Sequence, residues 1–145
     1  MKIVGLITEY NPFHNGHLYH IERAKSITGA DTAIVVMSGN YVQRGAPAIM
    51  PKHLRAEVAL KAGVGLILEL PVCYAVGSAE FFAAGAVSLF EQLGCIDSIC
   101  FGSECGDYEL LSRIAHILAD EPDEFRLRLQ DALKTGMSFP RARQT

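Results

Sequence analysis

Two histidines three residues apart stand at the start of a predicted helix. His14 and His17 enclose Asn15 and Gly16 in the string His-Asn-Gly-His. Side chains three residues apart lie on the same side of a helix, so both imidazoles should face the same space. Neutral or protonated imidazoles donate hydrogen bonds that stabilise the charge developing when an α-phosphate is attacked and pyrophosphate leaves. The spacing therefore predicts a phosphate site at this helix start.

A buried strand and a helix must position the two histidines. Residues 1–7 are mostly apolar, which is typical of a strand covered on both faces of a parallel sheet. The residue before a proline is kept out of the α region, so no helix can begin before Pro12. The first amides of the helix should be unpaired and favour an anion, and Gly16 should let a ligand approach the backbone closely.

The motif has simpler interpretations. One histidine near a helix start is usually a surface or capping residue, and His-x-Gly-His occurs by chance in many sequences. Its place after the first strand of an alternating chain favours the phosphate site. A metal site is not expected, because His14, His17 and His20 drift around the helix and do not converge on one tetrahedral ion. We expect His20 on the helix surface or a pocket wall.

The rest of the chain alternates buried strands with helices. Strands are predicted at 1–7, 32–37, 66–70 and 98–101, and helices after residue 14 and at 52–62, 77–93, 107–118 and 123–133. This alternation predicts a three-layer α/β fold with a parallel sheet and helices on both faces. A chain of 145 residues, half of them hydrophobic, is expected to form one domain.

Composition narrows the functional classes. The net charge of −3 gives no general basic surface for nucleic acid, so any such contact must rest on a local patch or on parts of a longer polypeptide outside this chain. No apolar run is long enough to span a membrane and no signal peptide is recognisable, so a soluble cytoplasmic protein is expected. The four cysteines form no Cys-x-x-Cys pair, and Cys95 and Cys100 are expected to be buried reduced thiols.

Further candidates follow the later strands. Ser38-Gly39-Asn40 forms a small-residue turn at the carboxyl end of the second strand, where such folds bind ligands. Glu69 should face this cleft or be paired. Positive charge at the start of the next helix, from Lys52, His53 and Arg55, slightly favours an anionic partner. Gly102 follows the fourth strand and should let an adenine or ribose lie against its backbone.

One longer stretch of sequence points to a known family. The string from Glu9 to His20, together with Ser38-Gly39-Asn40 and Gln43-Arg44-Gly45, resembles the bacterial tRNA(Met) cytidine acetate ligase family of the HxGH nucleotidyltransferase superfamily. The resemblance implies a Rossmann-like, HUP/nucleotidyltransferase-type sheet of order 3-2-1-4-5. It also implies an ATP site formed by Ile7, Thr8, Glu9, Tyr10, Asn11, Pro12, Phe13, His14, Asn15, Gly16, His17, Leu18, Tyr19, His20 and Gly102.

The resemblance also implies a reaction. Acetate would attack the α-phosphate of ATP to give acetyl-adenylate, and the wobble cytidine of elongator tRNA(Met) would take the acetyl group to give N4-acetylcytidine. His14 and His17 would stabilise the phosphates, and Mg²⁺ would bind through them. Two alternatives stay open: an adenylyltransferase acting on a small phosphorylated acceptor, and a nucleotide-binding module without chemistry. The oligomeric state is open.

Basic residues outside the motif are further candidates. Arg44 suits a phosphate or the acyl carboxylate, because a guanidinium matches planar oxyanions. Residues 134–145 form a basic tail, which on its own is usually solvated, but the resemblance makes Lys134, Arg141 and Arg143 candidates for triphosphate or tRNA contacts. Members of the family are markedly longer, so residues 1–145 are expected to be an ATP-binding domain at the amino-terminal end of a longer protein.

Overall fold

The computed structural model describes residues 1–143 and divides the chain into two compact units. The first unit is Met1–Gly102, and the second begins at Ser103. Every strand of the described chain belongs to the first unit. The expectation that residues 1–145 form one ATP-binding domain stays a prediction.

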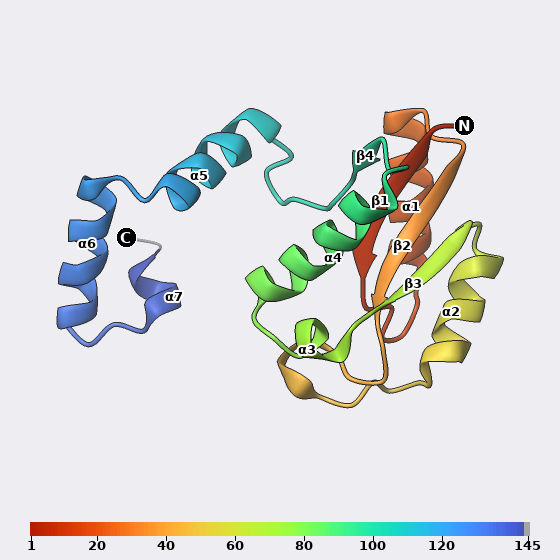
Figure 1. The fold of residues 1–145 in the computed structure, drawn as a ribbon, viewed down its shortest axis with the longest axis horizontal. Helices are drawn as coiled ribbons and strands as arrows, with labels where there is room; N and C mark the ends of the chain where they lie inside the picture. Colours follow the sequence, from red (N-terminus) through yellow and green to blue (C-terminus); the bar gives the residue numbers. More distant parts are fainter. Residues whose placement is uncertain (144–145) are drawn as a thin grey trace. The chain divides into compact units, whose positions relative to one another are not determined.

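A parallel sheet forms the centre of the first unit. Its strands are β1 (Ile3–Thr8), β2 (Thr32–Ser38), β3 (Leu66–Leu70) and β4 (Ser98–Ile99), in the order β3-β2-β1-β4 (Figure 1). This matches the first four positions of the expected 3-2-1-4-5 order, and residues 1–143 contain no fifth strand. The last strand is shorter than the predicted 98–101, although the Cys100 amide still donates to the Gly5 carbonyl at 3.0 Å.

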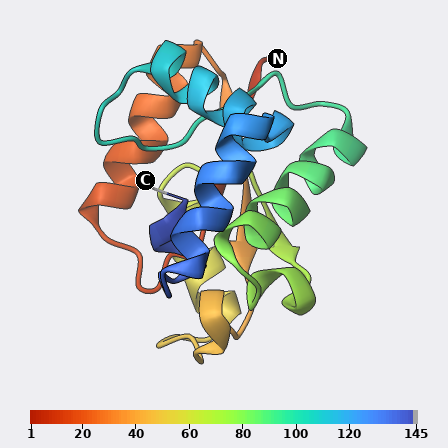
Figure 2. The same cartoon turned by 90° about the vertical axis from the view of Figure 1, so that its left-hand side faces the viewer.

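Helices cover both faces of the sheet, which confirms the three-layer α/β prediction. One hydrophobic cluster joins α1 (Asn15–Thr28) and α2 (Lys52–Lys61) to one face, and a second joins α3 (Val72–Ala75) and α4 (Ala79–Leu93) to the other. Figure 2 shows α1 and α4 on opposite sides of the strands. All strands run parallel, so their carboxyl ends, and the loops that carry the motif, meet at one edge of the sheet.

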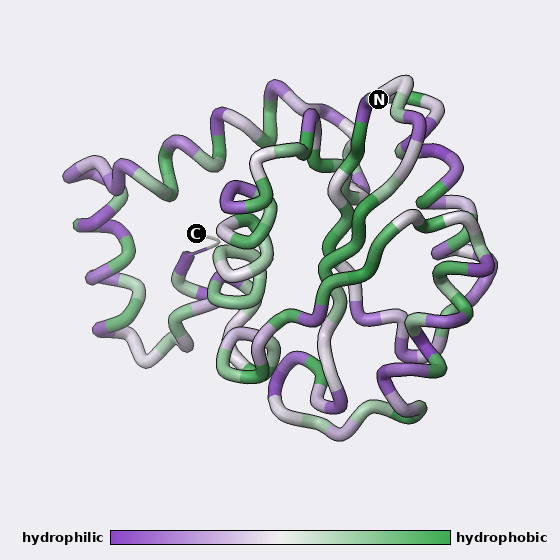
Figure 3. Tube along the Cα trace, turned by 45° about the vertical axis from the view of Figure 1, so that its right-hand side comes forward, coloured by the Kyte–Doolittle hydropathy of each residue, from purple (hydrophilic) through white to green (hydrophobic). Residues whose placement is uncertain are grey.

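Local sequence explains these elements. The strands are the most continuously hydrophobic part of the trace (Figure 3), and nearly every residue of β2 is buried. Gly29 ends α1 in the left-handed conformation, at φ 66°. The Ser78 hydroxyl accepts from the Phe81 amide at 3.3 Å and caps α4.

Several detailed predictions are wrong. Cys95 is exposed and Cys100 is half-buried. Two short elements were not predicted, α3 and the turn of 3-10 helix at Gln43–Gly45.

The second unit contains α5 (Tyr108–Asp120), α6 (Asp123–Lys134) and α7 (Phe139–Ala142). The first two match the predicted helices, and α7 lies inside the predicted basic tail. Two cations of that tail have partners within the unit: Lys134 pairs with Asp131 at 2.9 Å, and the Arg143 guanidinium lies 5.7 Å from the Phe139 ring centroid. Residues 144 and 145 of the tail lie outside the described residues.

Across residues 1–143, no helix combines the length and the apolar character that crossing a membrane requires.

Candidate functional site

His14 and His17 close the start of α1 through a reciprocal pair of hydrogen bonds. His14 is the N-cap residue, with an extended backbone at φ −146° and ψ 174°. Its Nδ1 atom accepts from the Gly16 amide at 3.1 Å, and the Nδ1 atom of His17 accepts from the His14 amide at 3.2 Å. The two imidazoles therefore form a capping box, a role that Ser and Glu more often fill.

The same hydrogen bonds fix the tautomers of both rings. A nitrogen that accepts a hydrogen bond carries no proton, so the proton lies on Nε2 in each imidazole. The rings stack with their centroids 3.7 Å apart and their planes 23° apart. Burial lowers the pKa of His17 most, and repulsion from His14 and His20 lowers it further, so the neutral form is favoured. The pair can thus present two neutral Nε2–H donors side by side.

The prediction that the first backbone amides of α1 are unpaired is partly wrong. The Gly16 amide donates to the His14 ring, and the His17 amide donates to the His14 carbonyl at 2.9 Å. Because these two amides are engaged, the imidazole N–H groups take their place as the donors available at this helix start. The His14 ring occupies the space beside Gly16, because a Cβ added at Gly16 would lie 3.0 Å from both Cε1 and Nδ1 of His14.

Aromatic side chains support His17 from the other side. The Tyr10 ring meets the His17 ring edge-on, with centroids 4.9 Å apart, and the Phe13 ring lies 5.6 Å from it. Tyr10 is fully buried and has a left-handed backbone at φ 48°. Burial raises the pKa of Tyr10 to about 12, so the phenol stays neutral and acts as a packing surface.

Two polar residues of the motif hold the neighbouring loop, residues 41–50. The Glu9 carboxylate accepts from the Gln43 amide at 2.7 Å, and the Asn11 side-chain oxygen accepts from the Ile49 amide at 2.7 Å. These bonds make the loop a fixed wall beside the motif. Arg44 lies exposed on it, with a left-handed backbone at φ 69°.

The basic start of α2 has a different role from the one its sequence suggested. Arg55 is buried, and among residues 1–143 its guanidinium donates only to backbone carbonyls, so it is not a ligand for an anion. Lys52 pairs with Glu69 at 2.5 Å, which confirms that Glu69 is paired. A cavity of about 160 Å³ adjoins this ion pair, and its lining also includes His53.

Gly102 and His20 were also predicted as site residues. Gly102 follows β4, and an added Cβ there would have no neighbour within 4 Å, so the space beside its backbone is open. β4 pairs with β1 through Val4–Ser98 and Gly5–Ile99, and Gly102 comes after the end of this pairing. His20 is half-buried, its Nε2 has no hydrogen-bond partner in the described part of the chain, and burial lowers its pKa.

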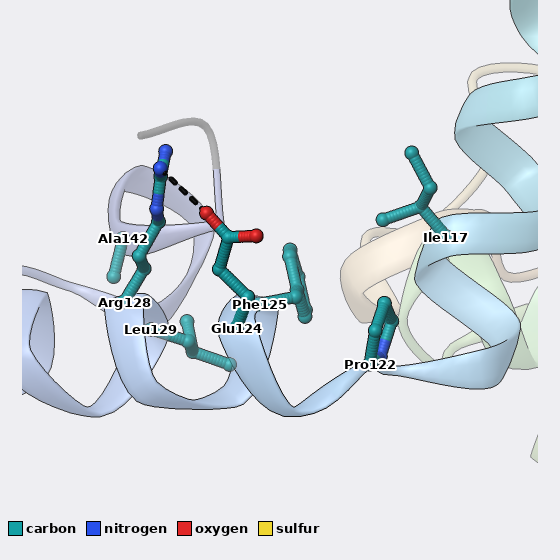
Figure 4. Close-up of a pocket in the computed structure, with 7 residues that line it drawn as sticks. All are labelled: Ile117, Pro122, Glu124, Phe125, Arg128, Leu129 and Ala142. Carbon is teal, nitrogen blue, oxygen red and sulfur yellow. Dashed lines mark hydrogen bonds and ion pairs between the residues drawn. The ribbon is translucent and has the colours of Figure 1, made fainter.

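The second unit holds a separate apolar cavity of about 320 Å³ (Figure 4). Its lining residues are Ile117, Pro122, Glu124, Phe125, Arg128, Leu129 and Ala142. The two charged members pair with each other, with Arg128 Nη2 2.8 Å from Glu124 Oε1. This cavity has the chemistry of a packing surface, whereas the motif at the start of α1 has converging donors.

Sequence reasoning missed two features of the site. The first is the use of Gly16 to seat the His14 ring, which no residue pattern indicates. The second is the buried guanidinium of Arg55. Its only sequence signal is the spacing of four from Ala59, which places Arg55 on the buried face of α2.

Curated proteins are similar to this chain over nearly all of its length. Among curated relatives, the tRNA(Met) cytidine acetate ligase of Acetivibrio thermocellus is 53% identical over 145 residues, which cover 100% of this chain and 35% of that protein. The enzyme of the same name from Clostridium kluyveri is 54% identical over 143 residues, which cover 99% of this chain and 35% of that protein. The chain thus spans about a third of the length of these relatives.

Solved structures agree with the sequence relatives. Thermotoga maritima TmcAL bound with alpha-thio ATP matches with a TM-score of 0.92 at 50% identity, over 99% of this chain and 35% of that one. Its apo form matches with a TM-score of 0.94 at 50% identity, over 99% of this chain and 34% of that one. The family model described as HIGH nucleotidyl transferase matches residues 1–145. This chain therefore belongs to the HIGH nucleotidyl transferase family.

Proposed function

We propose that the polypeptide carrying this sequence is an ATP-dependent ligase that acetylates the wobble cytidine of elongator tRNA(Met). The observation that carries the proposal is the His14–His17 pair, which directs two Nε2–H donors away from the helix start that they cap. The names of the relatives and the ATP analogue in the matched Thermotoga structure support the same conclusion. Because the chain spans about a third of these relatives, the activity is assigned to the whole polypeptide.

The first step that we propose is acid activation. A carboxylate oxygen of acetate attacks the α-phosphorus of ATP, the bond to the bridging oxygen of the β-phosphate breaks, and pyrophosphate leaves. Acetyl-adenylate is the other product. His14 and His17 donate from Nε2 to the phosphate oxygens on which negative charge increases, and neither forms a covalent bond. The segment Ile7–His20 and Gly102 would bind the nucleotide.

Magnesium would enter with the nucleotide. Within residues 1–143, no three His, Cys, Asp or Glu side chains converge on a point where they could hold a metal ion. The residues present therefore fit an ion bound through ATP phosphates better than one held by a protein cage. Such an ion would neutralise charge on the departing pyrophosphate.

The second step transfers the acetyl group. The exocyclic N4 of cytidine attacks the carbonyl carbon, the bond to the AMP oxygen breaks, and the amine loses a proton. N4-acetylcytidine and AMP result. A tRNA substrate would place the proposed ligase in the cytoplasm. The net charge of −3 means that tRNA contacts rest on local basic groups or on parts of the polypeptide beyond this chain.

Pyrophosphate release tests the proposal. The full polypeptide is incubated with ATP and Mg²⁺, with and without acetate, in the absence of tRNA. We expect release that depends on acetate, followed by acetylation when elongator tRNA(Met) is added. Release that requires a phosphorylated acceptor would favour an adenylyltransferase, and ATP binding without any release would favour a binding module. Either result would overturn the ligase.

A further inference from the structure

Arg55 is a fully buried cation whose hydrogen bonds all go to the backbone. Its side chain belongs to α2, and the residue is 1% exposed. Nε donates to the Met50 carbonyl at 3.1 Å, and Nη1 donates to the Glu9 carbonyl. Nη2 donates to the Ser38 carbonyl at 3.1 Å and to the Gly39 carbonyl. One planar group thus joins four carbonyl oxygens.

These carbonyls belong to three segments that are distant in sequence. Glu9 follows β1, Ser38 ends β2 and Gly39 comes next, and Met50 precedes α2. Among residues 1–143, no carboxylate oxygen accepts a hydrogen bond from the guanidinium, and Glu9 and Glu69 act on it only through longer-range attraction. A buried cation is costly without satisfied donors, so its position depends on all of these carbonyls. The three segments are therefore held in one fixed relation.

Arg55 is linked to His17 through two residues, Glu9 and Tyr10. The Glu9 carbonyl that Arg55 holds forms the peptide bond to Tyr10, whose backbone has the left-handed φ of 48°. The buried Tyr10 ring in turn lies edge-on to the His17 ring, with centroids 4.9 Å apart. A shift of the Glu9 peptide would move the aromatic surface against which His17 packs.

We propose that Arg55 is a positioning residue for adenylation, which acts through Glu9 and Tyr10 to hold the His17 imidazole where it meets the α-phosphate. The proposal rests on the proposed function in taking adenylation as the reaction that His17 serves. It separates Arg55 from the ligands of ATP, because all of its hydrogen bonds are made within the protein. It also explains why an arginine is needed: only a planar fork with five N–H donors can reach carbonyls in three directions.

The test is a double-mutant cycle in the full polypeptide. The Arg55→Lys variant keeps the charge and loses the fork, and its effect is measured in the native background and in the His17→Ala background. The rate of acetate-dependent pyrophosphate release is measured over a range of ATP concentrations, which gives kcat and the KM for ATP. The Arg23→Lys variant, exposed on α1, is the matched control. Every assay is run below the melting midpoint of the least stable variant.

We expect Arg55→Lys to lower kcat by about 10- to 100-fold with little change in the KM for ATP. In the His17→Ala background the same substitution should lower kcat by less than about threefold, because the group that it positions is already gone. Equal losses in both backgrounds, a change in KM alone, or failure of the variant to fold would assign Arg55 a purely structural role and overturn the proposal.

A separate readout distinguishes this proposal from the proposed function. If the native polypeptide releases no pyrophosphate with acetate, the ligase assignment fails. The link from Arg55 to His17 is then measured by the NMR signal of the His17 Cε1–H group. Arg55→Lys should shift this signal and its pH titration, and Arg23→Lys should not. An unchanged signal would overturn the positioning role whatever reaction the polypeptide performs.

Discussion

In the proposed adenylation, the imidazoles of His14 and His17 each use one nitrogen to cap α1 and the other to donate to the phosphates. Nδ1 of each ring accepts a backbone hydrogen bond, and the 3.7 Å stacking of the rings places the two Nε2 atoms in the same region. Donors fixed before the reaction stabilise developing charge without reorganising, which is the source of their catalytic value. The residues that seat these rings are therefore as important as the rings themselves.

Gly16 is one of those residues. In Gly16→Ala the new Cβ would lie 3.0 Å from the His14 ring and would displace it. Loss of this cap costs about 1 kcal/mol, while replacing glycine recovers a similar amount through the unfolded state. We expect a free energy of unfolding within about 1 kcal/mol of the native value, with adenylation slower by about tenfold or more. Denaturant unfolding and pyrophosphate release measure the two.

The exposed Ser26, on the same helix, offers a control for Gly16. Ser26→Ala should change neither the free energy of unfolding nor the rate appreciably. A Gly16→Ala variant with the native rate would show that the His14 ring does not depend on the space at Gly16.

The lowered pKa of His17 predicts a loss of stability in acid. Its folded pKa lies below the unfolded value of about 6.5, so the unfolded chain binds a proton that the folded chain does not. The contribution is fully present above about pH 6.5 and is lost as the pH falls toward the folded pKa. Burial lowers the pKa of His20 in the same direction.

Denaturant unfolding between about pH 7.5 and 5 measures this effect. The free energy of unfolding should fall less steeply on acidification in His17→Gln than in the native protein, and less again when His20→Gln is added. Identical slopes in all three proteins would show that neither ring is kept neutral by the fold.

At the scale of elements, α4 packs against α3 through a glycine. Gly85 is buried, and an added Cβ would lie 2.6 to 2.8 Å from Cγ, Cδ1 and Cβ of Tyr74. These atoms are close to the Tyr74 backbone and cannot move away easily. We expect Gly85→Ala to lower the free energy of unfolding by about 1–3 kcal/mol through overpacking. Thermal and denaturant unfolding measure the change.

Ser88 provides the matched position on the same helix. It is exposed, so Ser88→Ala should leave the free energy of unfolding within about 0.5 kcal/mol of the native value. Equal stability of Gly85→Ala and Ser88→Ala would mean that α3 moves freely relative to α4.

The elements differ in how much of them the sequence could predict. Continuous apolar runs identified β1 and β2, because burial on both faces leaves a local pattern, whereas β3 has a similar apolar run although only Leu70 is buried in it. The place of Arg55 could not be predicted in this way, since its four carbonyl partners come from residues 9, 38, 39 and 50. The His14–His17 contact was predictable from spacing, whereas the choice of Nδ1 as the acceptor depends on the cap geometry.

At the scale of the whole molecule, the first unit contains both hydrophobic clusters of the sheet and the complete motif from β1 to α1. The relatives extend far beyond the length of this chain. We therefore expect acid activation to depend on the motif, and recognition of tRNA to depend on the whole polypeptide.

The most direct test follows an oxygen atom. The full polypeptide is incubated with ATP, elongator tRNA(Met) and acetate labelled with ¹⁸O at both oxygens, and the products are analysed by mass spectrometry. Attack of acetate on the α-phosphorus, followed by acetyl transfer to cytidine, must leave one ¹⁸O atom in AMP. We predict this label in AMP, together with unlabelled pyrophosphate. Label in inorganic phosphate with formation of ADP would mean that acetate attacks the γ-phosphate, which would contradict acetyl-adenylate formation at this site.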